Sequence, residues 1–136
     1  EKKEAPLKEI VRGLQKTYGG TIGIEYKGLQ FPQLEKWMQK QIEPLQGAPA
    51  FSLEEKKKLL TLLNKAELFE SFLHTKYVGQ KRFSLEGGET LIPILHEILR
   101  EGAKNGMEEC IIGMSHRGRL NVLTNILNKS FSTVFS

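Results

Sequence analysis

A length of 136 residues is enough for one modest domain or for parts of two, and 39% apolar with 26% charged residues excludes a disordered chain. The formal net charge of +4 comes mainly from basic residues interleaved with glutamates, which favours solvated helix faces over nucleic-acid binding. A single cysteine excludes a disulfide framework or zinc ribbon within the chain, and no apolar run approaches the roughly 18 residues that cross a bilayer.

The first half of the chain is predicted to be helical. Apolar residues recur at helical spacing over residues 6–16, and a second helix is expected between Pro32 and Pro44, with Trp37 in the core. Residues 21–26 are short, β-branched and punctuated by glycine, which predicts an extended or turn segment. A connector is expected over residues 46–50, where glycine and proline are frequent.

A third helix is predicted from a capping box. In the run Ser52-Leu53-Glu54-Glu55, the serine hydroxyl can accept from the Glu55 amide while the Glu55 carboxylate reaches back to the Ser52 amide. The helix should continue to about Leu73. Its buried stripe is expected to comprise Leu59, Leu62, Leu63, Ala66, Phe69 and Leu73.

The pattern changes after Gly79. A helix is predicted to begin near Glu89 or Thr90 and to end at Asn105-Gly106. The apolar run at residues 109–114 predicts a strand buried on both faces, with Cys110 as a buried thiol. A loop at residues 115–119 and a helix from Leu120 to Leu127 complete an order of helix, strand, loop and helix, which is typical of an α/β parallel sheet.

The loop at residues 115–119 is the first candidate site. It follows the predicted strand, and ligands of open α/β sheets bind at the carboxyl ends of strands. Arg117 and Arg119 flank Gly118 where the helix should begin, an arrangement suited to a carboxylate or phosphate. His116 could donate a proton or a hydrogen bond near neutral pH. The spacing leaves open the alternative that both arginines pair with nearby glutamates and that His116 caps the helix.

A second candidate site lies at residues 81–88. Lys81 and Arg82 precede Gly87-Gly88 at the expected start of a helix, which could form an anion cradle, although an exposed turn is the preferred interpretation of this run alone. The basic cluster with Tyr77 could also bind RNA, but its aromatic spacing matches no standard RNA-binding signature. His74 and His96 have no carboxylate or cysteine at metal-ligand spacing and are expected at the surface or behind a site.

Read together, the two loops are similar to sequences of one enzyme family. The run HTKYVGQKRFSLEGGE at residues 74–89, followed by Leu91-Ile92-Pro93, looks like the entry to the catalytic region of thiamine-diphosphate-dependent 2-oxoglutarate dehydrogenases. The run GMSHRGRLNVL at residues 113–123 resembles the histidine loop of that family, in which alanine or proline is more frequent at the position of Ser115. Residues 18–26 and the Ser52 capping box match the helical segment before it.

The resemblance implies a function. The parent enzyme would decarboxylate 2-oxoglutarate on thiamine diphosphate with Mg²⁺, and would transfer the succinyl group to a lipoyl arm of a dihydrolipoyl succinyltransferase in the tricarboxylic acid cycle. Arg82 would contact the cofactor and His116 would be catalytic, close to the thiazolium and the substrate. The parent enzyme would be a homodimer without nucleic-acid or membrane partners, cytoplasmic in a bacterium or in the mitochondrial matrix of a eukaryote.

We expect the chain to be an N-terminal fragment of that enzyme, inactive alone. It begins at Glu1 without a methionine and ends while a helical pattern continues. The resemblance implies that the metal ligands follow residue 136, so that no metal site is expected here. The predicted fold is α/β but α-rich: a helical segment over residues 1–75, then the start of the thiamine-diphosphate-binding parallel-sheet domain over residues 76–136.

Two alternatives remain from the sequence. A 2-oxoadipate dehydrogenase paralogue would share these loops, since one substrate methylene is worth only about 1–3 kcal/mol of discrimination. A non-catalytic helical assembly module would use the first half of the chain to bind complex partners.

Overall fold

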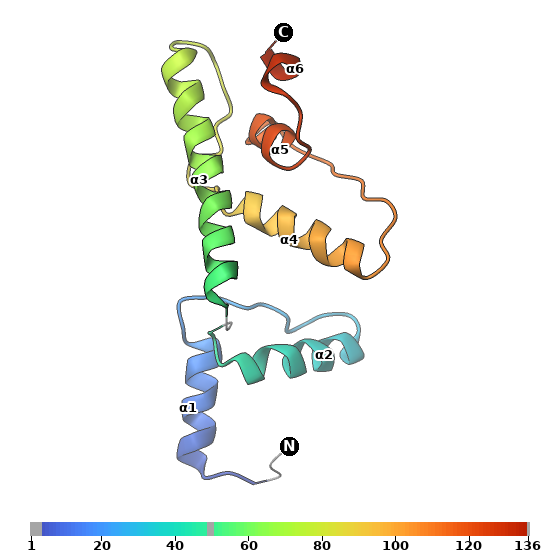
Figure 1. Ribbon diagram of the computed structural model, residues 1–136. Helices are drawn as coiled ribbons and strands as arrows, with labels where there is room; N and C mark the ends of the chain where they lie inside the picture. Colours follow the sequence, from blue (N-terminus) through green and yellow to red (C-terminus); the bar gives the residue numbers. More distant parts are fainter. Residues whose placement is uncertain (1–3, 49–50, 136) are drawn as a thin grey trace. The chain divides into compact units, whose positions relative to one another are not determined.

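The computed structural model describes residues 4–48 and 51–135, and every regular element in them is helical (Figure 1). The chain forms two compact units, Glu1–Phe51 and Ser52–Ser136. The predicted division after residue 75 concerns the domains of a longer protein and stays a prediction. Among the described residues, no helix combines the length and the apolar character required to cross a bilayer.

The first unit contains α1 (Leu7–Tyr18), α2 (Pro32–Ile42) and a 3-10 turn, η1 (Glu43–Leu45). Both predicted helices are therefore confirmed, and residues 21–26 form a bend and an irregular stretch between them. The Tyr18 and Tyr26 hydroxyls lie 2.7 Å apart, and the Tyr18 hydroxyl donates to the Glu43 carboxylate at 3.1 Å. These bonds, Tyr26 first, raise the pKa of Tyr18.

Much of the apolar surface of the first unit is exposed. Trp37 is 55% exposed, so its predicted place in the core is wrong. The apolar stripe of α1 is at least partly exposed along its length; it comprises Leu7, Ile10, Val11 and Leu14. The helical spacing of apolar residues predicted these helices correctly. Two short helices, however, offer too little surface to bury both apolar stripes.

The second unit begins with α3 (Leu53–Lys76), and its capping box is formed as predicted. The Ser52 hydroxyl accepts from the Glu55 amide at 3.2 Å, and the Glu55 carboxylate accepts from the Ser52 amide at 2.8 Å. Within the predicted stripe, Leu62, Ala66, Phe69 and Leu73 are buried, and Leu59 and Leu63 are half-buried.

Replacing Ser52 by alanine should destabilise the second unit by about 0.5–2 kcal/mol, because the first turn of α3 loses a cap. The Ser52 amide, and then its hydroxyl, lower the pKa of Glu55. This contribution is present above the ordinary glutamate pKa of 4.5 and is lost as the pH falls through the lower folded value. Urea unfolding at pH 7 and pH 3 checks both points: the difference between wild type and Ser52→Ala should shrink at pH 3. An equal difference at both pH values would contradict the role of Glu55.

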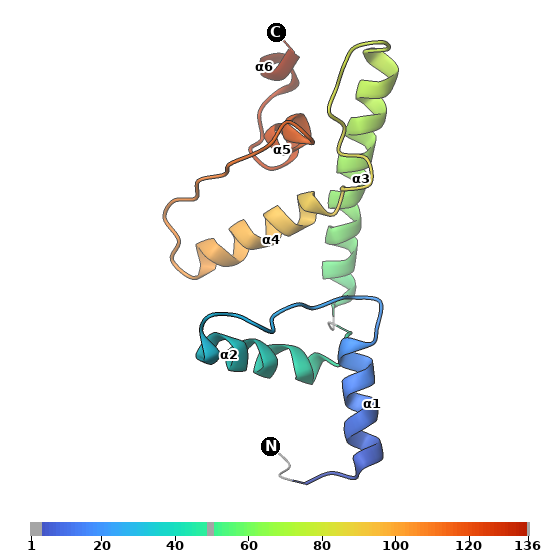
Figure 2. The ribbon, with the colours of Figure 1, turned by 180° about the vertical axis from the view of Figure 1, so that it is seen from behind.

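Three further helices complete the second unit: α4 (Leu91–Lys104), α5 (Arg119–Asn125) and α6 (Phe131–Phe135). Asn105 is the C-cap of α4 and Gly106 follows it at φ +82°, which confirms the predicted C-terminal signal. The helices α3, α4 and α5 pack around one apolar cluster, which contains Leu62, Ala66, Leu85, Ile92 and Val122. The stretch between α4 and α5 lies apart from the helices in both views (Figures 1 and 2).

The predicted strand at residues 109–114 is not formed. This segment is irregular, Ile111 is 96% exposed and Cys110 is exposed rather than buried. A strand needs a neighbour for its amides and carbonyls, and no strand occurs among the described residues to pair with it. The α-rich character of the prediction is confirmed, whereas the start of a parallel sheet is not found in the described part of the chain.

Candidate functional site

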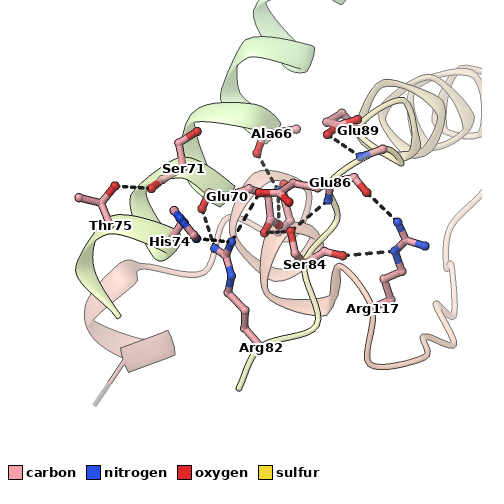
Figure 3. Close-up of polar contacts among 12 residues, drawn as sticks. Ala66, Glu70, Ser71, His74, Thr75, Arg82, Ser84, Glu86, Glu89 and Arg117 are labelled. Carbon is pink, nitrogen blue, oxygen red and sulfur yellow. Dashed lines mark hydrogen bonds and ion pairs between the residues drawn. The ribbon is translucent and has the colours of Figure 1, made fainter. Parts of the chain in front are cut away.

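The two loops singled out from the sequence are joined in the structure. The Gly118 amide donates to the Phe83 carbonyl at 2.9 Å. Arg117 reaches the same loop, with Nε 3.2 Å from the Ser84 carbonyl and Nη2 2.6 Å from the Glu86 carbonyl (Figure 3). Three hydrogen bonds therefore hold together segments that are more than 30 residues apart in the chain.

The joined loops border one cavity of about 240 Å³. His116 is exposed at this cavity, and its ring centroid lies 5.3 Å from that of Phe83. Arg82 also lines it, so the structure brings the two predicted site residues to a common cavity, while their roles stay predictions. The cavity is lined by Glu70, Leu73, Lys81, Arg82, Phe83, Ser84, His116, Gly118, Arg119 and Leu120.

Arg82 lies against α3. Its Nη1 donates to the Glu70 carbonyl at 2.8 Å, and its Nη2 lies 3.2 Å from Nδ1 of His74 and 3.5 Å from the Glu86 carboxylate (Figure 3). The guanidinium is thus oriented by the protein before any ligand arrives. His74, expected at the surface or behind a site, contacts the predicted cofactor-binding residue.

Arg117 and Arg119 bind backbone carbonyls, and the alternative that they pair with nearby glutamates is not seen for either of them in the described residues. Arg117 bonds to the loop at residues 84–86, as above, and Nη2 of Arg119 donates to the Met114 carbonyl at 3.2 Å. α5 begins at Arg119, one residue earlier than predicted, and has seven residues, so its macrodipole adds little to anion binding. These arginines support the His116 loop.

The predicted anion cradle at Gly87-Gly88 is occupied by the protein itself. The Gly87 amide donates to the Glu89 carboxylate at 2.8 Å. The amides of Glu89 and Gly87 lower the pKa of the Glu89 carboxyl, assisted by the charge of Arg117. This run is therefore a turn whose own amide and carboxylate bond to each other, and a turn is the interpretation that the sequence alone favoured.

The most buried polar pair at the site was not anticipated from the sequence. Glu70 is 3% exposed and Asn121 is fully buried. Nδ2 of Asn121 donates to the Glu70 carboxylate at 3.0 Å and to the Ala66 carbonyl at 2.9 Å. A signal was available, because Glu70 interrupts the apolar stripe of α3 between Phe69 and Leu73 and must therefore find donors in the interior.

The charge around the cavity favours an anionic ligand. Lys81, Arg82 and Arg119 line it together with His116. The one carboxylate in the lining belongs to Glu70, and hydrogen bonds from Ser84 and Asn121 already engage both of its oxygens. Guanidinium and ammonium groups around such a hollow suit a carboxylate or a phosphate.

The chain is similar over nearly its whole length to short segments of longer proteins. No family model matches it. The 2-oxoglutarate dehydrogenase E1 component of Cupriavidus necator is 46% identical over 135 residues, which is 99% of this chain and 14% of that protein. The E1 component of Azotobacter vinelandii is 45% identical, over 98% of the chain and 14% of that protein. The multifunctional 2-oxoglutarate metabolism enzyme of Mycolicibacterium vanbaalenii is 47% identical, over 96% of the chain and 10% of that protein.

Proposed function

Because this chain is homologous over nearly its whole length to one segment of the 2-oxoglutarate dehydrogenase E1 components, we propose that it supplies part of the active site of such an enzyme. The chain spans 14% of the length of the Cupriavidus necator relative, so activity belongs to the complete polypeptide. The proposed reaction is decarboxylation of 2-oxoglutarate and transfer of the succinyl group to a lipoyl arm of a dihydrolipoyl succinyltransferase, with the complete polypeptide acting as a homodimer.

One observation carries the proposal: Arg82 and His116, from loops far apart in the sequence, line one cationic cavity. The substrate is a dicarboxylate and the implied cofactor is a diphosphate, so both ligands are anions. Exposed His116 can donate a hydrogen bond or a proton to a bound substrate, and the ring of Phe83 supplies an apolar wall beside it. Lys81, which also lines the cavity, adds positive charge.

The fit to thiamine diphosphate is partial. A cavity of about 240 Å³ is below the roughly 300–1,000 Å³ of typical small-molecule sites, so it accommodates one anionic end of a ligand. Arg82 and Lys81 would hold that end, and the remaining walls would come from other parts of the enzyme. When bound, thiamine diphosphate supplies the nucleophilic carbon and the electron sink for loss of carbon dioxide. By the family resemblance, we assign the Mg²⁺ ligands to residues outside this chain.

Turnover by the complete polypeptide tests the proposal. With thiamine diphosphate, Mg²⁺ and ferricyanide as electron acceptor, it should decarboxylate 2-oxoglutarate, whereas the isolated 136-residue chain should show no turnover. A complete polypeptide that preferred 2-oxoadipate would support the paralogue instead. Absence of turnover with both 2-oxo acids would contradict the proposal.

Arg82→Gln should weaken cofactor binding. A hydrogen bond to a charged group is worth about 1.5–3 kcal/mol, so the thiamine diphosphate concentration for half-maximal activity should rise about 10- to 100-fold. Titration of the complete polypeptide with cofactor measures this shift. Arg12→Gln, which removes an exposed guanidinium of α1, is the matched control and should leave the titration unchanged. An unchanged titration for Arg82→Gln would remove this residue from the cofactor site.

A further inference from the structure

Glu70 is a buried carboxylate for which the proposed reaction provides no role. It lies on α3 and is 3% exposed, and no lysine or arginine side chain pairs with its carboxylate within the described residues. Burying an ionised carboxylate without a cation is costly unless hydrogen bonds replace the lost water. Its partners must therefore explain its presence.

Those partners come from the loop that carries Arg82 and from α5, the helix that follows the His116 loop. Oε2 accepts from the Ser84 hydroxyl at 2.8 Å, in the loop that carries Arg82 and Phe83. Oε1 accepts from Nδ2 of Asn121 at 3.0 Å, in the helix that follows the His116 loop. The backbone carbonyl of Glu70 accepts from Arg82 at 2.8 Å, as Figure 3 shows. One residue of α3 thus contacts both the loop that carries Arg82 and α5, the helix that follows the His116 loop.

We propose that Glu70 is a positioning residue. Its buried carboxylate fixes the position of the Arg82 loop (residues 81–88) relative to the His116 loop (residues 115–119). The expected effect of Glu70 on turnover rests on the proposed function. Its expected effect on the order of the two loops does not. Ser84 extends the contact, because its hydroxyl donates to Glu70 and accepts from the Glu86 amide at 3.1 Å. Loss of the carboxylate should therefore loosen the Arg82 loop as well as the helix of Asn121.

The carboxylate is required because Asn121 cannot turn its amide around. Nδ2 of Asn121 also donates to the Ala66 carbonyl, while its Oδ1 accepts from Nδ2 of Asn125 at 2.7 Å. An isosteric glutamine at position 70 must therefore keep its carbonyl oxygen toward Nδ2 of Asn121 and turn its amide toward the Ser84 hydroxyl, which donates to the carboxylate in the wild type. The Ser84 hydroxyl would have to rotate and accept instead of donate, so the contact to the loop that carries Arg82 is the one that weakens.

Glu70→Gln in the complete polypeptide tests the proposal by two measurements. Hydrogen exchange of peptides covering residues 113–120, which include the Gly118 amide bonded to Phe83, should become about five- to tenfold faster. The kcat for 2-oxoglutarate should fall on the order of 10- to 100-fold, because small displacements of reacting groups are costly. Leu63→Ala is the control: this half-buried residue lies on the same helix, and its loss should destabilise α3 without either effect on the loops.

A second variant tests the contact to the loop that carries Arg82 from its other end. If Glu70→Gln does not fold, Ser84→Ala removes one carboxylate contact at a half-buried position and should accelerate exchange at residues 81–86. Loop exchange within about twofold of the Leu63→Ala control for these variants would overturn the positioning role. Absence of 2-oxoglutarate turnover in wild type, with faster loop exchange in Glu70→Gln, would instead contradict only the proposed function.

Discussion

Replacing His116 by alanine should lower turnover of 2-oxoglutarate by the complete polypeptide about 100- to 10,000-fold, the usual contribution of a positioned proton donor or acceptor. His116 is exposed at the cavity, and its one aromatic neighbour in the described residues is Phe83. Little packing is lost on truncation, so the free energy of unfolding should change by about 1 kcal/mol or less. Steady-state kinetics with ferricyanide and thermal unfolding of the same preparation measure the two effects.

His96→Ala is the matched control for this variant. His96 lies on α4, 3.2 Å from the Glu97 carboxylate and outside the cavity lining, so its loss should leave turnover within about twofold of wild type. Parallel losses of activity and stability in His116→Ala would indicate that His116 is structural. A full-activity His116→Ala enzyme would remove this residue from the chemistry.

Replacing Gly118 by alanine should have the largest effect on stability. Gly118 has φ +73°, which costs a residue with a Cβ about 1–2 kcal/mol. The added Cβ would lie 2.5 Å from Cδ1 of buried Leu85 and 3.3 Å from its Cβ and Cγ, and overpacking of this kind costs about 1–3 kcal/mol. The free energy of unfolding should therefore fall by about 2–5 kcal/mol, because the close contact and the backbone strain act together. Denaturant unfolding measures it.

Gly106→Ala separates the two contributions. Gly106 has φ +82° but no atom within 4 Å of an added Cβ, so this variant carries the backbone cost alone. The difference between the stability losses of Gly118→Ala and Gly106→Ala then measures the cost of the contact with Leu85. Gly118→Ala should also lower turnover, because the Gly118 amide joins the two loops. Equal losses for the two variants would show that Leu85 moves aside easily.

Residues near in sequence were sufficient to predict the helices. Ser52 and Glu55 satisfy each other three positions apart, and Asn105 with Gly106 ends α4, so both termini were readable from short motifs. The resemblance to 2-oxoglutarate dehydrogenases also came from contiguous runs, and the relatives at 43–47% identity agree with it. The same runs contain Arg82 and His116, which the structure brings to one cavity.

The partners of the polar side chains depended on tertiary structure. Arg117 donates to carbonyls 31 and 33 residues away and not to nearby glutamates, the alternative that its spacing left open, and Asn121 donates to Glu70 51 residues away. The amide and carbonyl groups of an α-helix are satisfied within four residues, so a helix can be recognised locally. Strands, burial and side-chain partners depend on surfaces that other segments bring. This is why residues 109–114 and Trp37, apolar by sequence, are not buried here.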